Sequence, residues 1–201
     1  MEPIILASGS PRRQEYFRLL GLPFTCIPSP IAEIFDLGAE PGAVAEELAR
    51  KKIGKVLSIL GERPQPSSSS PLWVCGADTL ISLEGRIYGK PGNRDEARET
   101  LRAFAGRTHE VITAVALYSG RTGKTDCRPV TSKITFAALS PGEIEWYLDT
   151  GEWQDAAGAY KIQGKASCFI SSIKGSYSSI VGLPLREFYR MLKDNGYPYG
   201  G

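Results

Sequence analysis

Apolar residues occur along the chain in short runs with two kinds of spacing. Runs such as 3–7 and 111–118 are continuous and strand-sized, which favours buried strands. Segment 42–60 instead repeats apolar residues every three or four positions, which favours a helix. The whole pattern predicts strand 3–7, helix 11–20, strand 23–28, helix 42–60, strand 72–77, hairpin 80–88, helix 94–104, strands 110–118 and 125–137, helix 141–149, strand 166–173 and helix 185–194.

This alternation of strands and helices indicates an α/β protein with a mixed sheet. Two of the predicted helices begin with a capping residue, Asn93 and Ser140, three positions before a glutamate, and a glycine ends each of them. Segment 64–71 consists mainly of proline and serine, so we expect a mobile surface loop there. Residues 1–201 are long enough for one domain, or for two closely joined lobes.

Composition and charge limit the classes of function. Of the 201 residues, 42% are hydrophobic and 23% are charged, which favours a packed core over a disordered chain. The net charge of +2 lacks the concentrated basic footprint that binds a nucleic acid polymer. No apolar run reaches the ~18 residues that span a membrane. The N-terminus lacks the basic region of a signal peptide, so we expect a cytoplasmic protein.

The four cysteines are widely separated and form no C-x-x-C pair. Three of them lie in apolar stretches, where a thiol serves as a small apolar group. We therefore expect buried structural cysteines rather than a metal or redox site.

A candidate anion site follows the first predicted strand. Ser8 and Ser10 lie in a tight turn, Pro11 opens the next helix, and Arg12 and Arg13 follow. Free backbone N–H groups, two hydroxyls and two guanidinium groups are together able to bind a phosphate. A capped helix with solvated arginines is the alternative. The segment lacks G-x-x-x-x-G-K-[ST], so it is not a Walker loop.

Two charged residues interrupt apolar patterns. Lys52 falls inside the apolar stripe of helix 42–60, so its ammonium group must either reach solvent or meet an anion. Asp78 directly follows the apolar run 73–77. A carboxylate in such surroundings is costly to desolvate unless it binds a metal, a donor or a reacting water. Asp78 is therefore the strongest catalytic candidate, and an aspartate that ends a strand and caps a turn is the alternative.

Weaker signals lie elsewhere in the chain. Lys90 ends a short strand before a proline, and Gln163 lies in a glycine-flanked segment whose amide is able to read a nucleobase edge. His109 is the only histidine and has no Ser-His-Asp spacing, so we expect it to be structural. Acid–base chemistry must then rest on carboxylates. Glu33 and Asp78 are the natural pair for binding Mg²⁺ and activating water.

Taken in order, these segments resemble the Maf family of nucleotide pyrophosphatases over essentially the whole chain. The matching stretches are Leu6–Arg13, Glu33, Leu48–Lys52, Gly76–Thr79, Gly89–Pro91, Gly106 with His109–Thr113, Thr150–Glu152, Ala157–Gly164 and Val181–Leu185. The resemblance implies a fold like that of the inosine triphosphate pyrophosphatases: a long curved mixed sheet, flanking helices, and a deep cleft between two lobes. It also implies hydrolysis between the α- and β-phosphates with a divalent cation, Mg²⁺ or Mn²⁺.

The resemblance also assigns roles to single residues. Asp78 matches the family's proton acceptor, and Glu33 joins Asp78 as a metal-site carboxylate. The positions that match phosphate ligands are Ser8, Ser10, Arg13, Lys52 and Lys90. Arg12, Thr79 and Gln163 match the branch that acts on dTTP and UTP rather than on 7-methyl-GTP. A glutamine amide donates and accepts at once, which suits the edge shared by thymine and uracil.

The chain departs from the family pattern at Ala156, where a lysine is usual, so its ranking of normal and modified pyrimidine nucleotides is open. Two other functions also stay open. One is a nucleotide-binding regulator of cell division that needs no turnover, and the other is a phosphohydrolase that releases orthophosphate. The expected partner is a small nucleotide, with no membrane and no nucleic acid polymer, and association into a homodimer is left open.

Overall fold

The computed structural model describes residues 1–29, 31, 39–61 and 72–199. The strands within this part of the chain are β1 (Ile4–Leu6), β2 (Phe24–Cys26), β3 (Trp73–Leu83), β4 (Arg86–Tyr88), β5 (Thr108–Ser119), β6 (Lys124–Phe136) and β7 (Ile170–Lys174). The helices are α1 (Pro11–Leu19), α2 (Pro41–Gly61), α3 (Arg94–Phe104), α4 (Pro141–Asp149), α5 (Tyr177–Val181) and α6 (Leu185–Asp194), with the 3₁₀ helices η1 (Ala157–Ala159) and η2 (Lys165–Phe169).

The strands form one seven-stranded sheet in the order β2-β1-β3-β5-β6-β7, with β4 also paired to β3. β1 is parallel to both of its neighbours, whereas the pairs that β3, β5 and β6 form with other partners are antiparallel. The predicted α/β class and mixed sheet are therefore confirmed. The single domain over 1–201 and the division into two lobes stay predictions.

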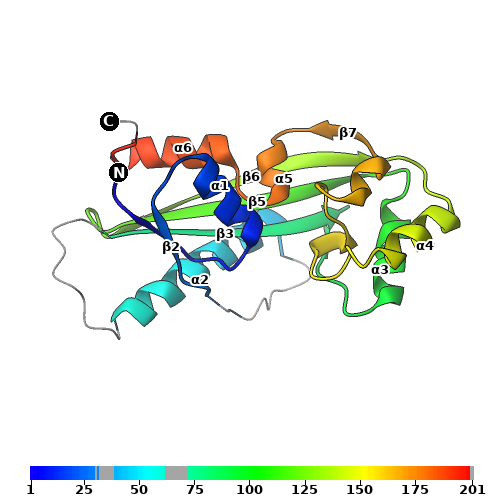
Figure 1. Ribbon diagram of the computed structural model, residues 1–201, viewed down its shortest axis with the longest axis horizontal. Coiled ribbons are helices and arrows are strands. Elements are labelled where there is room, and N and C mark those ends of the chain that lie inside the picture. Colours follow the sequence, from blue (N-terminus) through cyan, green and yellow to red (C-terminus); the bar gives the residue numbers. More distant parts are fainter. Residues whose placement is uncertain (30, 32–38, 62–71, 200–201) are drawn as a thin grey trace.

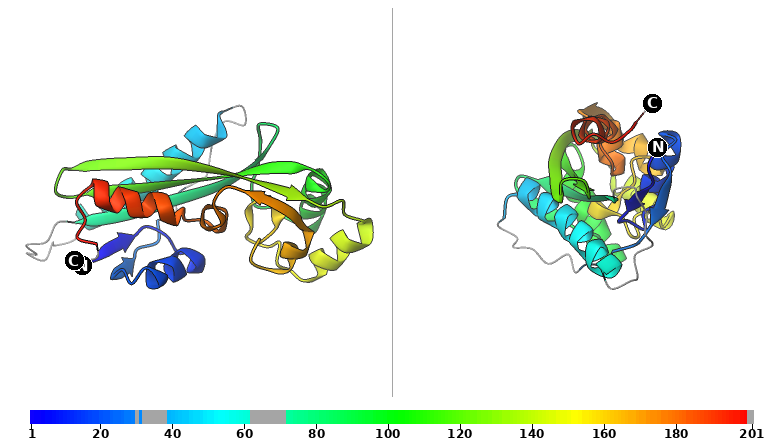
Figure 2. Two further views of the ribbon diagram at one scale, coloured as in Figure 1. Left: turned by 90° about the horizontal axis from the view of Figure 1, so that it is seen from above. Right: turned by 90° about the vertical axis from the view of Figure 1, so that its left-hand side faces the viewer.

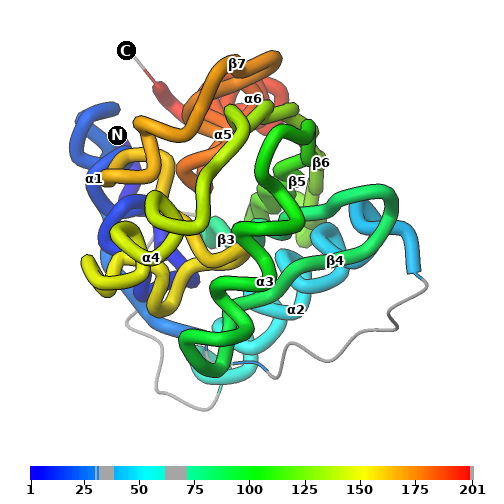
Figure 3. Tube along the Cα trace, turned by 90° about the vertical axis from the view of Figure 1, so that its right-hand side faces the viewer, coloured from blue at the N-terminus to red at the C-terminus, as the bar shows by residue number. Residues whose placement is uncertain are grey.

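Helices cover both faces of this sheet (Figures 1 and 2). Val74 and Ala116 pack toward α2 on one face, while Cys75 and Leu117 pack toward α1 and α6 on the other, because successive strand residues alternate between faces. A third apolar cluster lies at the end of the sheet that carries α3 and α4, which Figure 3 shows end-on. None of the described helices combines the length and the apolar content needed to cross a membrane.

The largest difference from the predicted elements concerns Asp78. The sequence predicted a strand at 72–77 and a hairpin at 80–88, with Asp78 between them. In the structure β3 continues unbroken to Leu83 and Asp78 lies in its middle. The reason is β5, which pairs with β3 from Trp73 to Ser82 and keeps the backbone extended through the charged residue. The alternative of a strand-ending, turn-capping aspartate is therefore wrong.

A second difference lies near the C-terminal end of the sheet. The predicted strand 166–173 is a 3₁₀ helix followed by β7, and α5 was not predicted at all. Ala166 and Phe169 are the buried residues of η2, and their separation of three matches the repeat of a 3₁₀ turn. The cysteine prediction holds for the buried Cys75 and is wrong for the exposed Cys168. The predicted loop 64–71 lies outside the described residues.

One edge of β3 is incompletely paired. β1 pairs with β3 only at Trp73–Cys75, and β4 pairs only at Ile81–Leu83. Among the described residues, Gly76–Leu80 therefore have no strand beside them on this edge, and Asp78 is the central residue of the gap. Because β1 runs parallel to β3 and β4 runs antiparallel, both strands end at the gap. The turns that follow β1 and β4 therefore lie close to Asp78.

A close approach of α2 to β3 occurs at the start of this gap. A Cβ atom added at Gly76 would lie 2.7 Å from the Ala49 carbonyl oxygen and 3.0 Å from Ile53 Cγ1. Only a glycine leaves room for the helix backbone at this distance. The contact sets the separation between α2 and the strand that carries Asp78.

Gly76→Ala is expected to lower the free energy of unfolding by about 1–3 kcal/mol, because the methyl group forces α2 away from β3. Urea denaturation measures this change. Gly54→Ala is the matched control in α2, since an added Cβ there would meet no atom of another element within 4 Å. It should raise stability by roughly 0.5–1 kcal/mol through helix propensity. Unaltered stability of Gly76→Ala would contradict the packing argument.

Candidate functional site

A cavity of about 650 Å³ lies at the gap in β3. Its walls come from the β1–α1 turn, α2, β3, the exit of β4, β5, the segment 155–163 and α5. The predicted site residues that line it are Ser8, Ser10, Arg12, Arg13, Lys52, Asp78, Thr79, Lys90 and Gln163. The structure thus brings together every predicted site residue within its described part. Glu33 lies outside the described residues.

The turn after β1 forms one end of the site. Ser8 is buried, and its Oγ accepts hydrogen bonds from the backbone N–H of Ser10 at 3.2 Å and from Arg13 Nη1 at 3.1 Å. Ser10 is the N-cap of α1, yet its hydroxyl makes no capping hydrogen bond within the described chain. Pro11 begins the helix, as predicted. Ser10 and Pro11 both line the cavity, so the start of α1 lies in its wall.

Arg13 joins this turn to three other elements. Its Nε donates to the Gly182 carbonyl at 2.8 Å and its Nη2 donates to Thr79 Oγ1 at 3.2 Å. Thr113 Oγ1 donates to the Ser179 carbonyl at 2.7 Å, so across the 2.9 Å contact the Thr79 hydroxyl donates to Thr113. The hydrogen of the Thr79 hydroxyl is thus directed into the protein. Arg13 and Thr79 hold the turn against the sheet and α5.

Lys52 forms the most buried ion pair among the described residues. Its Nζ contacts Asp78 Oδ1, and the side chains of Lys52 and Asp78 are only 13% and 4% exposed. Lys52 Nζ also lies 3.5 Å from the Ala77 carbonyl oxygen. The lysine in the apolar stripe therefore meets an anion, which was one of its two predicted environments. A buried ion pair contributes little to the net stability of a protein. The place of this pair in a cavity wall therefore indicates a catalytic or binding role.

Positive side chains outnumber negative ones around the cavity. Among the described residues, the cations of its wall are Arg12, Arg13, Lys52, Lys90 and Lys161, and the carboxylates are Asp78 and Asp155. Lys161 and Asp155 were not singled out from the sequence, although Lys161 stands directly between the apolar residues Tyr160 and Ile162, both of which are buried. This excess of positive charge suits a polyanion such as a triphosphate.

Apolar residues also contribute much of the cavity wall. They include Leu80, Ile81, Val111, Tyr160, Ile162, Ile180 and Val181. An apolar wall with a few polar groups is typical of a site that binds a planar organic group. Gln163 is exposed at the rim of this wall. The wall of the site thus has a cationic part, made of the five cations, and an apolar part, made of these apolar residues.

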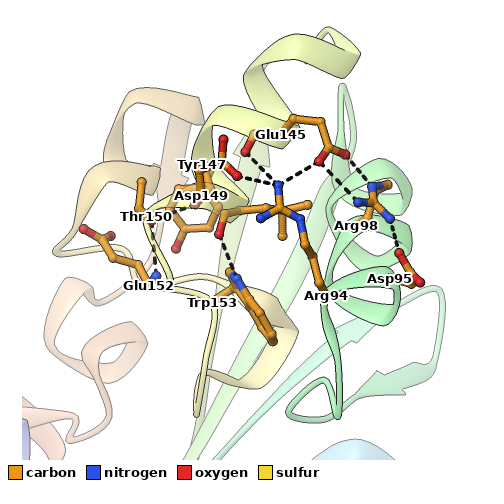
Figure 4. A network of polar contacts seen from close by, with 10 residues as sticks. Arg94, Asp95, Arg98, Glu145, Tyr147, Asp149, Thr150, Glu152 and Trp153 are labelled. Atoms are coloured by element: carbon orange, nitrogen blue, oxygen red, sulfur yellow. Dashed lines mark hydrogen bonds and ion pairs between the residues drawn. The ribbon is translucent and has the colours of Figure 1, made fainter.

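Helices α3 and α4 support the apolar part from outside. Arg94 and Arg98 of α3 both pair with Glu145 of α4, and Arg94 also contacts Asp149 at 2.6 Å (Figure 4). Together the two arginines lower the pKa of Glu145 to about 2, Arg98 having the larger effect. The Trp153 indole then donates to the Leu148 carbonyl at 3.0 Å and fixes the turn that leads into segment 155–163.

His109 lies behind this wall and is not among the residues that line the cavity. Its Nε2 is 2.8 Å from the Tyr160 hydroxyl, and its ring stacks on Phe104 with centroids 4.2 Å apart. Burial lowers the pKa of His109 to about 4, so the ring is neutral at neutral pH. The prediction of a structural histidine agrees with this placement.

Metal binding by the described residues would depend on Asp78. No group of three or more His, Cys, Asp or Glu side chains in this part of the chain is arranged to hold a metal ion. Mg²⁺ commonly takes one or two protein carboxylates and completes its shell with water and substrate phosphates. One buried carboxylate beside a cationic pocket therefore fits a cation that arrives with a triphosphate.

The sequence of the chain matches a known protein family. The family model described as Maf-like protein matches residues 3–195. The chain is 41% identical over 193 residues to a dTTP/UTP pyrophosphatase of Bacillus cereus (strain G9842), covering 96% of this chain and 95% of that protein. It is 42% identical over 197 residues to a dTTP/UTP pyrophosphatase of Chromobacterium violaceum, with the same shares covered.

Among solved structures, the chain is similar to the Ham1 protein of Staphylococcus aureus, with a TM-score of 0.42 and 18% identity. The match covers 68% of this chain and 72% of that one. A likeness at this level carries no argument about function.

The neutral His109 predicts a pH-dependent stability. Its pKa is about 4 in the folded protein against 6.5 for a solvated histidine, so the unfolded chain binds the proton first as the pH falls. Above pH 6.5 His109 is neutral in both states and does not lower the free energy of unfolding. Between pH 6.5 and 4 the free energy of unfolding falls by up to about 3 kcal/mol, because only the unfolded chain binds the proton. Urea denaturation of the wild type and His109→Phe at several pH values tests this. Equal pH slopes for both proteins would contradict the assignment, since His109 is the only histidine.

Proposed function

The chain belongs to the Maf family, and on that premise we propose that it is a nucleoside triphosphate pyrophosphatase that hydrolyses dTTP and UTP. The products are the nucleoside monophosphate and pyrophosphate. The observation that carries the proposal is the convergence of the predicted site residues on one cavity at the gap in β3. The relatives with 41% and 42% identity, both dTTP/UTP pyrophosphatases, support the substrate class.

The cationic part of the cavity takes the triphosphate. Backbone N–H groups at the start of α1 and the hydroxyl of Ser10 donate to phosphate oxygens. Arg12 and Lys90 neutralise the charge that grows on the leaving pyrophosphate. Arg13 keeps this turn in place through its bonds to Ser8 and Thr79. Thr79 thus influences the site mainly by positioning Arg13, although it also lines the cavity.

Asp78 is the proton acceptor of this proposal. A water attacks the α-phosphorus in line with the bond to the bridging oxygen, and Asp78 takes the proton as the new P–O bond forms. The bond between the α-phosphorus and the bridging oxygen breaks, and pyrophosphate leaves with the electron pair. Lys52 orients the Asp78 carboxylate through the ion pair between them.

A divalent cation, Mg²⁺ or Mn²⁺, belongs to the same proposal. Asp78 supplies an oxygen ligand from the described residues, and the family resemblance adds Glu33. When bound with the triphosphate, such a cation neutralises phosphate charge. A cytoplasmic location, where nucleoside triphosphates are made and used, completes the proposal.

The apolar part of the cavity takes the nucleobase. Tyr160 and Ile162 form its surface, and Gln163 at the rim presents an amide that donates and accepts hydrogen bonds. Thymine and uracil share a donor between two carbonyl acceptors, so one amide is able to bind either base. This accounts for a site that accepts both dTTP and UTP.

Asp78→Asn is expected to lower kcat for dTTP by about 10²- to 10⁴-fold, because the proton acceptor is lost while the amide oxygen still accepts from Lys52. Nucleotide binding by calorimetry and the melting temperature should stay close to the wild type. Glu99→Gln is the control, since Glu99 is an exposed carboxylate of α3 outside the cavity. An Asp78→Asn enzyme with wild-type turnover would refute the role of Asp78.

Product analysis of the same reactions separates the other two functions. A pyrophosphatase yields monophosphate and pyrophosphate in equal amounts, whereas a general phosphohydrolase yields orthophosphate. Nucleotide binding without any turnover, in the presence of Mg²⁺ or Mn²⁺, would favour a nucleotide-binding regulator of cell division. That result would overturn the proposed function.

Gln163→Glu is expected to change the ranking of dTTP, UTP and 7-methyl-GTP more than the kcat for the best substrate. A carboxylate accepts hydrogen bonds but no longer donates, so recognition of the pyrimidine carbonyl groups is lost. The measurement is kcat/KM for each nucleotide. The loss of one hydrogen bond to the base is expected to lower kcat/KM about tenfold. An unchanged ranking would contradict base reading by Gln163.

A further inference from the structure

Segment 155–163, which contributes Tyr160 and Ile162 to the apolar part of the cavity, has an irregular backbone. Asp155 and Ala159 have φ angles of 55° and 61°, in the left-handed region that residues with a Cβ rarely adopt. Such conformations persist only where surrounding contacts impose them. The contacts that hold this segment therefore decide where Tyr160 and Gln163 lie.

Three hydrogen bonds tie the segment to neighbouring elements. The Gly158 N–H donates to the Gly89 carbonyl at 3.0 Å, which joins it to the turn that carries Lys90. The Lys161 N–H donates to the Tyr147 hydroxyl at 3.3 Å. The Tyr160 hydroxyl forms a hydrogen bond with His109 Nε2 at 2.8 Å. Of the three hydrogen bonds, this one joins two buried side chains.

The imidazole of His109 packs against aromatic rings. It stacks on Phe104 with an interplanar angle of 16° and meets Phe136 edge-on at 5.1 Å. Phe104 also lies against Gly158, where an added Cβ would be 3.1 Å from its ring. One aromatic ring thus packs against both the histidine and the segment that the histidine bonds.

We propose that His109 is a positioning residue of the nucleotide site. Through the Tyr160 hydroxyl it holds segment 155–163 against the exit of β4, so that Gln163 and Lys90 face one ligand. His109 does not line the cavity and acts only through Tyr160. This inference rests on the proposed function.

The hydrogen bond between His109 and Tyr160 is tested by variants that remove or keep one of its two partners. His109→Leu removes the hydrogen-bonding nitrogen, and Tyr160→Phe removes the hydroxyl. His109→Gln keeps an amide that is able to donate to or accept from the phenol. Tyr199→Phe is the control, because it deletes a tyrosine hydroxyl that donates to the Leu20 carbonyl at 3.1 Å, away from the cavity.

The first measurement is steady-state pyrophosphate release from dTTP. His109→Leu and Tyr160→Phe are each expected to raise KM about tenfold, with kcat changed less than about threefold. The double variant should be no worse than either single variant, because both remove the same bond. In His109→Gln the KM should return close to the wild-type value, and Tyr199→Phe should have the KM and kcat of the wild type. A lower melting temperature with an unchanged KM in His109→Leu would overturn the proposal.

The second measurement needs no turnover. Amide hydrogen exchange of the nucleotide-free protein should be faster over residues 156–164 in His109→Leu, while α6 keeps its protection. Unchanged exchange over 156–164 would overturn the positioning role. If the wild type released no pyrophosphate from dTTP or UTP, the proposed function would fail. The exchange result would still decide whether His109 positions this segment.

Discussion

The interruption of strand pairing along one edge of β3 determines where the site lies. β5 pairs with the opposite edge without a break, so β3 stays extended through Gly76–Leu80 although neither β1 nor β4 lies beside these residues. β1 and β4 approach the gap from opposite directions and both end there. The turns that carry Ser8 and Lys90 therefore meet at Asp78 without any long connecting loop.

The same gap lets the two faces of the sheet contribute to one cavity. Adjacent residues of a strand point to opposite faces, so Asp78 meets Lys52 from α2 while Thr79 meets Arg13 from α1. In a fully paired sheet these contacts would be separated by the sheet itself. At the gap all four residues line one cavity. The close approach of α2 at Gly76 brings Lys52 within reach of the carboxylate.

Segment 155–163 contributes to the apolar part of the cavity together with β3, β5 and α5. Its irregular backbone makes its position depend on the side chains behind it. Arg94 and Arg98 fix α4 to α3, and His109 fixes Tyr160.

The sequence by itself determined the features that depend on neighbouring residues. Periodicity predicted most strands and helices, and the predicted capping residues Asn93 and Ser140 do cap α3 and α4. Charges inside apolar patterns identified Lys52 and Asp78. Only the tertiary structure decided that Asp78 lies within a strand and pairs with Lys52, that Arg13 reaches Gly182, and that His109 supports Tyr160. The partners of these contacts lie 26, 169 and 51 positions apart, and sheet register and helix packing bring them together.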